Sequence, residues 1–600
     1  MTIATLRKLE QLYKRIHKPI EDLAFPLILL LWPLNKITQG IDVTDSTYSL
    51  GNYLFADRLK GTWVMATYLS NFFGSLFVKL PGGDTLLGMN IYTGLVISLT
   101  ALIVYYGLRK DFTAPVLFLG EFISISFCWI PSGILYNYLT YLFLSLAAIL
   151  LYYGVKEMKI LNFYFAGMIL GFNVFVRIPN VVEMMLILVV LICVPMALKQ
   201  INEANWKRGN ELMAIIGACI VGYVIGMSIP MAMMATVYGG NTFARMFAGL
   251  MALSESNSEY TAGSMLYRTF AAYLHSLKWT GIIVAVIFAG TLMMAVLKSH
   301  TVLKWIGRTI YTAVLALMLR FMWGRGMFSF RYYEDYTSMY EWGMILIMIS
   351  WVCVFTVLVK RNYNLLIKTY ATIVMVILII TPMGSNNYTM QNINNLFLVV
   401  PFTLYVTGGW LYKGVHRIRL QNVLYGCNFP WMSMVLLIFA VILVQSIGFH
   451  TGFVFKDGMD GTPRDSSIVK NAATESVGGI YTTGQNARII TELCDYVYGD
   501  KSIKSMVYWG NCPGLAYILR IPSEIGTTWP DLDSYPVEDL EAELKLITDR
   551  QAKGRTALVW REYSEYSGVN TKYKEDMVKE FIELNHMRVV FENEEYRIYK

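Results

Sequence analysis

The stretch that decides the fold class is residues 87–107, which read LGMNIYTGLVISLTALIVYYG and carry no charged side chain. A helix needs roughly 20 predominantly apolar residues to cross the hydrocarbon core of a bilayer. Arg109 and Lys110 follow almost directly. An apolar stretch of this length with a basic end is typical of a transmembrane helix whose basic end lies in the cytoplasm.

Similar apolar stretches recur along the first three quarters of the chain. Of the 600 residues, 55% are hydrophobic and only 15% are charged, whereas soluble proteins carry about 25% charged residues. This composition excludes cytosolic enzymes, collagen-like chains and disordered scaffolds. The sequence predicts a polytopic α-helical membrane protein of about thirteen spans, near 23–38, 87–107, 113–130, 133–153, 161–178, 181–199, 211–235, 279–297, 303–323, 342–360, 366–383, 393–411 and 431–449.

Basic residues in the short loops orient these spans. If the N-terminus is cytoplasmic, every predicted cytoplasmic segment is basic, as the positive-inside rule requires. The bases are Arg7, Lys8, Lys14, Arg15, Lys18, Arg109, Lys110, Lys156, Lys159, Lys199, Lys207, Arg208, Lys298, Lys304, Lys360, Arg361, Lys368, Lys413, Arg417 and Arg419. Because the number of spans is odd, we expect the C-terminal segment to be extracytoplasmic. We expect the protein to lie in the plasma (inner) membrane.

The C-terminal quarter differs in composition from the rest. Residues 451–600 contain 24 acidic and 18 basic residues, whereas residues 1–450 contain 18 acidic and 32 basic ones. We expect a membrane domain at 1–450, with a long first outer loop at 39–86, and a soluble three-layer α/β domain at 451–600. Its strands are predicted near 479–482, 505–509, 557–560 and 587–591, and its helices near 484–498, 536–552 and 572–585. Since topology explains the basic residues, we expect no nucleic-acid partner.

Two cysteines of the C-terminal quarter raise the question of a disulfide. Cys494 and Cys512 could pair if this part of the chain is extracytoplasmic. The other five cysteines lie in or beside apolar spans, where a cysteine is usually a small buried hydrophobe. The sequence contains no His/Cys cluster with the spacing of a metal site.

The first outer loop opens with two carboxylates three residues apart, in Gly40-Ile41-Asp42-Val43-Thr44-Asp45-Ser46-Thr47-Tyr48. One of them could act as a general base on a hydroxyl group. Together, Asp42 and Asp45 could hold a divalent cation such as Mg²⁺ or Mn²⁺. They could equally be helix caps or solvated loop acids. Aromatic and basic residues at helical spacing in 50–80 indicate an amphipathic helix, which either lies in the membrane interface or packs against the protein.

Polar residues at the outer ends of other spans are further candidates. Arg177 lies at an outer boundary, against the positive-inside trend, and could bind a ligand, snorkel or pair with Glu183. The guanidinium groups of Arg325 and Arg331 match phosphate oxygens. Amides at a third outer end could bind sugar hydroxyls or form a turn. The remaining candidates in these segments are Asn180, Glu334, Asp335, Asn386 and Asn387.

The whole pattern resembles the GT-C superfamily of integral-membrane glycosyltransferases, which includes protein mannosyltransferases, oligosaccharyltransferases and the aminoarabinose transferases of bacterial lipid A. The resemblance rests on Asp42 and Asp45 with Tyr48, on the amphipathic stretch 50–80 and on the tail 451–600. In place of the family's usual Asp-Glu or Glu-x-Asp pair, this chain has Asp-x-x-Asp. The departure leaves open both metal dependence and which aspartate is the base.

The resemblance implies a polyprenyl-phosphate-sugar donor and a glycan, lipid or protein acceptor. It implies transfer with inversion, with Asp45 as base because Tyr48 follows it as in many relatives, and with Asp42 supporting it or binding metal. The implied substrate-binding residues are Tyr48, Arg177, Asn180, Arg325, Arg331, Glu334, Asp335, Asn386 and Asn387. A transporter or flippase of a lipid-linked sugar, a polysaccharide polymerase or ligase, and a non-enzymatic assembly protein are the alternatives.

Overall fold

The computed structural model describes residues 16–59, 62–130, 132–201, 205–256, 262–297, 300–330, 337–383, 387–420, 422–454, 464–532, 535–549, 556–562 and 570–600. Within these ranges, eight helical segments are long and apolar enough to cross a membrane. The chain is therefore a multi-pass membrane protein. The helices that contain these segments are α6 (Leu86–Leu108), α8 (Leu135–Glu157), α10 (Ile187–Ile201, continuing the 3-10 helix Ile178–Leu186), α11 (Asn205–Tyr238), α13 (Ala262–Val296), α14 (Thr301–Gly324), α15 (Thr337–Val359) and α19 (Asn422–Gly452).

The other five predicted spans also contain helix. The first is divided into a π-helix, the α-helix α2 and a 3-10 helix over Ile20–Lys36, because Pro26 and Pro33 interrupt regular α-helical hydrogen bonding. The remaining four are α7 (Ala114–Phe127), α9 (Ile160–Asn173), α16 (Leu365–Ile380) and α18 (Val399–Leu420). Of these, α7, α9 and α16 are shorter than 18 residues.

The predicted outer loop 236–278 is wrong in its local structure, because much of it is helical. The helix α12 covers Thr242–Ser256, and α13 already begins at Ala262, well before the predicted span at 279. Between 264 and 278 the sequence has no glycine or proline and contains several good helix formers, so nothing interrupts the helix. The first outer loop also contains helices, namely α3 (Asp45–Leu54), α4 (Thr62–Ala66) and α5 (Tyr68–Val78).

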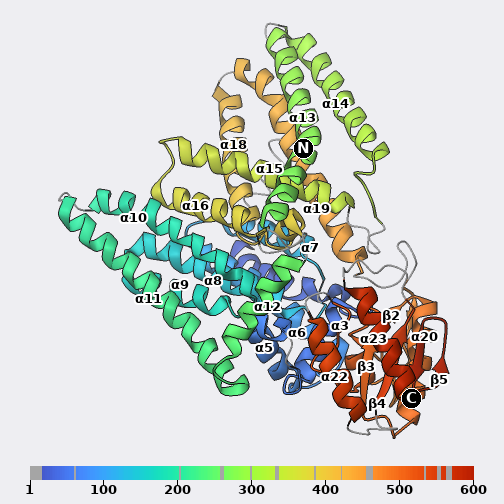
Figure 1. The fold of residues 1–600 in the computed structure, drawn as a ribbon. Helices are drawn as coiled ribbons and strands as arrows, with labels where there is room; N and C mark the ends of the chain where they lie inside the picture. Colours follow the sequence, from blue (N-terminus) through green and yellow to red (C-terminus); the bar gives the residue numbers. More distant parts are fainter. Residues whose placement is uncertain are drawn as a thin grey trace.

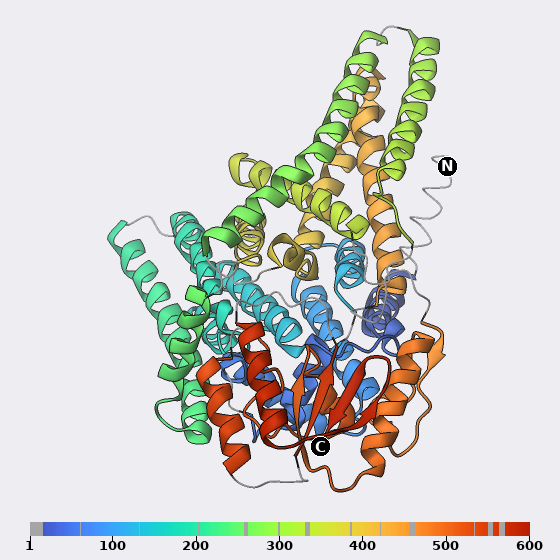
Figure 2. The same cartoon turned by 45° about the vertical axis from the view of Figure 1, so that its right-hand side comes forward.

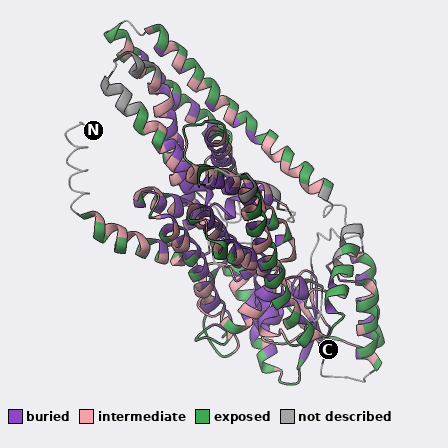
Figure 3. Ribbon diagram, turned by 90° about the vertical axis from the view of Figure 1, so that its left-hand side faces the viewer, coloured by how far each residue is buried: buried purple, intermediate pink, exposed green. Residues whose placement is uncertain are grey.

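Burial separates central from peripheral helices. In the apolar window of α8, 72% of the residues are buried, against 22% in the windows of α11, α13 and α14. Figure 1 shows α13 and α14 extending away from the rest of the bundle, and α11 along its opposite flank. Buried residues gather where the helices converge, as Figure 3 shows. Apolar helices with this much exposed surface are expected to face lipid, whereas α8 is surrounded by protein.

The helix α9, which leads to Arg177, packs closely on α11 through small residues. A Cβ atom on Gly171 would lie 2.0 Å from the backbone oxygen of Tyr223, and one on Gly226 would lie 2.0 Å from that of Met168. Side chains at these positions would push the two backbones apart. Close packing through small residues is typical of helices that associate within a membrane.

The C-terminal region contains a mixed four-stranded sheet in the order β3-β4-β6-β5. Its strands are β3 (Ser505–Trp509), β4 (Thr556–Arg561), β5 (Val589–Glu592) and β6 (Tyr596–Tyr599), with β3 and β4 parallel and the other pairs antiparallel. Helices α22 (Val537–Asp549) and α23 (Thr571–Leu584) cover one face, and α20 (Gly484–Gly499) covers the other. Alternate β3 residues enter the two cores, with Val507 on the α22–α23 side and Met506 on the α20 side. The predicted three layers are confirmed, whereas β6 and the short β1 (Ser466–Ser467), which pairs with β2 (Tyr481–Thr482), were not predicted.

The C-terminal region packs directly on the first outer loop. The backbone N–H of Gly514 donates to the Val43 carbonyl at 2.8 Å, and the hydroxyl of Tyr517 donates to the Asp84 carbonyl at 2.9 Å. Figure 2 shows the first-loop helices against the sheet region. Cys494 and Cys512 are both buried and free, so the suggested disulfide between them is not formed. The sheet region and the loop that carries Asp42 and Asp45 therefore form one packed unit.

Candidate functional site

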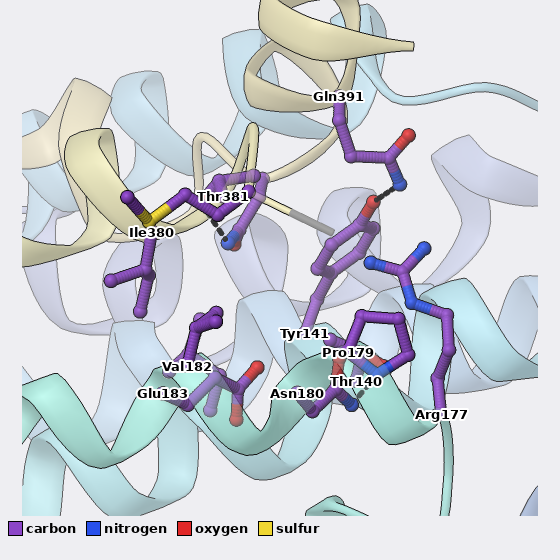
Figure 4. Close-up of a pocket in the computed structure, with 13 residues that line it drawn as sticks. Thr140, Tyr141, Arg177, Pro179, Asn180, Val182, Glu183, Ile380, Thr381 and Gln391 are labelled. Carbon is purple, nitrogen blue, oxygen red and sulfur yellow. Dashed lines mark hydrogen bonds between the residues drawn. The ribbon is translucent and has the colours of Figure 1, made fainter. Parts of the chain in front are cut away.

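Five segments that are distant in sequence meet around a small cavity (Figure 4). They are the beginning of α8, the 3-10 helix after Arg177, the end of α16, the turn after it, and the short helix α17 (Tyr388–Asn394). All of them were predicted to be outer ends of spans. The lining residues are Thr140, Tyr141, Leu144, Arg177, Pro179, Asn180, Val182, Glu183, Ile380, Thr381, Met383, Gln391 and Asn395.

Arg177 is held at the edge of this cavity by a network of amides. Asn137 Oδ1 accepts hydrogen bonds from Arg177 Nη1 at 3.2 Å and from Gln391 Nε2 at 3.1 Å. Gln391 Nε2 also donates to the hydroxyl of Tyr141. The buried Nε of Arg177 has no hydrogen-bond partner among the described residues. The guanidinium is thus fixed in direction and retains donors for an anionic ligand, since the planar fork matches phosphate and carboxylate oxygens.

The opposite wall of the cavity is polar, and its side chains form hydrogen bonds within the protein. Asn180 Nδ2 donates to Thr140 Oγ1 at 2.7 Å and to the Asn173 carbonyl at 3.0 Å. In the described part of the chain, the carboxylate of Glu183 accepts from Asn173 Nδ2 at 2.7 Å rather than pairing with Arg177. The ion pair between Arg177 and Glu183 that the sequence left open is therefore not formed. Figure 4 shows Glu183 and Arg177 apart, with Asn180 and Pro179 between them.

Asp42 is buried and caps the beginning of α3. Its Oδ1 accepts from the Thr44 backbone N–H at 2.9 Å and from the Thr44 hydroxyl, and its Oδ2 accepts from the Ser46 backbone N–H at 2.8 Å. Such bonds satisfy N–H groups that the first turn of a helix leaves free. A second small cavity adjoins Asp42. Its lining residues are Gln39, Gly40, Asp42, Ser46, Leu86, Asn90, Ile130 and Ser132.

Asp45 is the first residue of α3 and is half-buried. The helix α3 lies against the start of α8, which also carries Asn137, the hydrogen-bond partner of Arg177. The position of α3 is fixed there by Tyr53, whose hydroxyl donates to the Gly133 carbonyl at 2.9 Å and accepts from the Leu135 N–H at 3.1 Å. The first-loop acid and the cavity arginine therefore belong to one region.

Tyr48 lies one helical turn after Asp45 and contacts the C-terminal region. Its ring packs edge-on against Trp529 at a centroid distance of 5.1 Å. Burial raises the pKa of Tyr48 to about 12, so its hydroxyl keeps its proton at neutral pH. Tyr48 is thus a neutral hydrogen-bonding group next to Asp45, at the contact between the first loop and the sheet region.

The carboxylate of Asp42 is largely engaged within the protein. Cations such as Mg²⁺ bind carboxylate oxygens that can direct free lone pairs toward the metal. Both oxygens of Asp42 already accept hydrogen bonds from α3 and its cap. Within the described ranges, no three His, Cys, Asp or Glu side chains come together in the way a metal site requires.

Other candidates from the sequence lie away from the cavity. Arg325 is exposed at the end of α14, with its guanidinium 5.3 Å from the ring centroid of Phe321. Asn387 is exposed at the N-terminal end of α17 and does not line the cavity. Four candidates lie outside the described residues: Arg331, Glu334, Asp335 and Asn386.

Sequence reasoning did not select Asn137, Tyr141 or Gln391, although these residues position Arg177 or line the cavity. The available signal was the density of amides and tyrosines at two outer ends, in YNYLTY at 136–141 and MQNINN at 390–395. Such residues are common at membrane interfaces, where aromatic belts occur. Only the folded arrangement distinguishes a network around one arginine from an ordinary belt.

No family model matches the chain, and no curated protein matches it by sequence. Over most of its length, the chain is similar in structure to two membrane proteins of known structure. One is the Archaeoglobus fulgidus oligosaccharyltransferase, in its apo form (11% identity, 90% of this chain and 69% of that chain, TM-score 0.44) and in complex with Zn and sulfate (10% identity, 90% and 68%, TM-score 0.43). Another is ArnT from Cupriavidus metallidurans bound to undecaprenyl phosphate (12% identity, 96% of each chain, TM-score 0.38). Because all these TM-scores are below 0.5, the function proposed below rests on the residues of this chain.

Proposed function

We propose that this protein is a membrane glycosyltransferase that moves a sugar from a polyprenyl-phosphate donor to a hydroxyl-bearing acceptor. The single observation that carries the proposal is that the start of α8 holds both groups: Tyr53 anchors α3, the helix of Asp45, and Asn137 accepts a hydrogen bond from Arg177. A carboxylate can accept the proton of a hydroxyl nucleophile, and a guanidinium can stabilise the charge on a phosphate leaving group. The lipid chain of the donor would extend along the apolar helices below this region.

In the proposed reaction, Asp45 accepts the proton of the acceptor hydroxyl. At the same time, the oxygen of that hydroxyl attacks the anomeric carbon of the donor sugar. The bond between that carbon and the phosphate oxygen breaks, and the electron pair remains on the phosphate. Arg177 stabilises the charge that develops there through its guanidinium donors. Attack from the face opposite the phosphate inverts the configuration. Free polyprenyl phosphate and a protonated Asp45 remain, and the proton then passes to solvent.

The other residues of the region have supporting roles in this proposal. Asn137 and Gln391 orient Arg177, and the neutral Tyr48 hydroxyl lies beside the base. Asn180 and Thr140 present polar groups on the opposite wall. Asp42 stabilises the first turn of α3 and so positions Asp45. We place the reaction at the extracytoplasmic face of the plasma (inner) membrane, with the C-terminal domain (451–600) on the same side and a glycan, lipid or protein as the acceptor.

The experiment that tests the proposal follows the release of free lipid phosphate. Purified protein in lipid nanodiscs is incubated with radiolabelled polyprenyl-phosphate sugars and a mixture of membrane glycans, lipids and peptides. Asp45→Asn keeps the size of the side chain but removes its basicity, so we expect transfer to fall by about 10²–10⁴-fold with donor binding retained. The matched control is Asp57→Asn, which changes another, exposed first-loop acid and should leave transfer unchanged.

Two results would contradict the proposal. The first is a folded Asp45→Asn variant that transfers sugar at the wild-type rate. The second is movement of the labelled lipid between leaflets with no release of lipid phosphate, which would support the flippase alternative instead.

A further inference from the structure

A larger cavity, of about 540 Å³, lies at the other end of the same helices. The candidate site includes Thr140 near the start of α8, whereas this second cavity includes Lys156 near its end. At 1.5 Å per residue, the two positions are about 24 Å apart along the helix. The cavity is bounded by α8, α10, the beginning of α16 and the turn before α16, which pack together on the left side of the bundle in Figure 1.

The polar side of this cavity is strongly basic. Lys156, Arg361 and Lys368 all line it. Lys156 is neutralised by Asp111, whose two oxygens both lie 2.6 Å from its Nζ. In the described part of the chain, neither Arg361 nor Lys368 pairs with a carboxylate, so two positive charges remain uncompensated.

Two further groups favour an anion at the same place. The helix α16 begins at the cavity with Leu365, and Asn364 caps it by accepting from the Ile367 N–H at 2.9 Å. The partial positive charge of a helix N-terminus adds to that of the two cations. The hydroxyl of Tyr363 accepts from Trp410 Nε1 at 3.1 Å, which leaves its own proton available to donate.

The remaining wall is apolar, so the expected ligand is amphipathic. Val155, Met196, Leu365 and Leu366 line the cavity beside the charged groups. The positive-inside rule explains why bases occur in this region, but it does not require that they converge on a cavity with an apolar wall. Basic cavities between transmembrane helices are known to suit the head groups of anionic lipids.

We propose that this cavity binds the head group of an anionic phospholipid from the surrounding leaflet. The phosphodiester would bind Arg361 and Lys368, the fork of Arg361 making two hydrogen bonds and Lys368 one. The acyl chains would lie against the apolar residues of α10 and α16. The site is separate from the one proposed for sugar transfer, and its occupancy does not depend on that activity.

The test is native mass spectrometry of the full-length protein with phosphatidylglycerol, and separately with phosphatidylcholine. Each base near an anionic lipid contributes roughly fivefold in affinity, so Arg361→Ala combined with Lys368→Ala should weaken phosphatidylglycerol binding by about 30-fold. The matched control combines Lys110→Ala with Lys413→Ala, which removes two exposed bases that do not line the cavity. Wild-type protein and the control should both retain phosphatidylglycerol in preference to phosphatidylcholine.

Three outcomes would overturn the proposal. One is an equal loss of phosphatidylglycerol in the cavity variant and the control, which would indicate general attraction to the membrane surface. Another is equal retention of the two lipids by the wild type. The third is displacement of phosphatidylglycerol by millimolar inorganic phosphate, which would indicate a site for free phosphate rather than for a lipid. Because binding is read directly, none of these outcomes depends on sugar transfer.

Discussion

Replacing Arg177 should weaken the binding of the lipid-phosphate donor far more than it weakens the fold. Among the described residues, its guanidinium makes one hydrogen bond, to Asn137, and it lines the cavity with further donors. A hydrogen bond to a charged group contributes about 1.5–3 kcal/mol, and a fork can make two of them to a phosphate. For Arg177→Ala we therefore expect a loss of about 3 kcal/mol, which corresponds to a Kd roughly 150-fold higher.

The conservative replacement separates charge from geometry. In Arg177→Lys the positive charge remains, but the ammonium group cannot make the paired hydrogen bonds of the guanidinium. We expect about half of the loss, or a Kd roughly tenfold higher than that of the wild type. The stability cost should be close to that of one hydrogen bond from a charged donor at the weak end of the range, about 1.5 kcal/mol, because Gln391 still donates to Asn137.

The assay is equilibrium binding of polyprenyl phosphate to purified protein in detergent, with thermal unfolding of each variant as a check on folding. Arg58→Ala serves as the matched control, since Arg58 is an exposed first-loop cation outside both outer cavities. If Arg177→Ala and Arg58→Ala bind the lipid phosphate equally, the cavity arginine does not hold the donor phosphate.

Two further predictions concern the C-terminal region. A Cβ atom on Gly514 would lie 1.7 Å from Thr47 Oγ1, so Gly514→Ala should force this turn away from α3 and lower the free energy of unfolding by about 1–3 kcal/mol; an unchanged Tm would contradict this. Burial raises the pKa of Asp531 to about 6, although the Asn511 N–H donates to it at 2.7 Å. Since the pKa is higher in the folded state, the free energy of unfolding should be greatest below about pH 4 and should fall by about 3 kcal/mol as the pH rises through 6. The Asp531→Asn variant should lose this pH dependence, and unfolding measured between pH 4 and 7 tests both expectations.

The sequence predicted the membrane helices well where length alone determines them. An uncharged run of 21 residues at 87–107 has few alternatives to a spanning helix, and α6 begins and ends within one residue of it. The start of α13 was missed because the polar residues before 279 suggested a loop. In the folded chain those residues extend the helix, since hydropathy marks the membrane-spanning part of a helix and not its full length.

The sheet region shows the same division between local and long-range information. The strand β3 was predicted at its correct residues, because five apolar or small residues are bounded by turn signals. The strand β6 was missed, since Tyr596–Tyr599 alternates with charged residues and gains its partners only through pairing with β4 and β5. Short strands of this kind are determined by tertiary pairing more than by their own residues.

For the candidate site, the sequence could identify charges but not their partners. Spacing alone did not distinguish Asp42 from Asp45, and only the resemblance, through Tyr48, favoured Asp45 as the base. The structure separates them because α3 begins at Asp45, which leaves Asp42 in the position that caps the first turn. Arg177 was recognised because a cation at an outer helix end is unusual, whereas Asn137 and Gln391 are 254 residues apart and are joined only in the fold.

The anchoring of α3 explains why the effects of the variants should divide into two classes. Two contacts fix the helix that carries Asp45. On one side, the Tyr53 hydroxyl of α3 donates to the Gly133 carbonyl just before α8, and on the other the Gly514 N–H donates to the Val43 carbonyl. A general base must approach the hydroxyl proton to within hydrogen-bonding distance, so a shift of about 1 Å in α3 is enough to slow proton transfer. Arg177 is anchored separately, through Asn137 on α8 and Gln391 on α17. Loosening either anchor of α3 should therefore lower kcat with donor affinity retained, whereas loosening the amide network should lower donor affinity first.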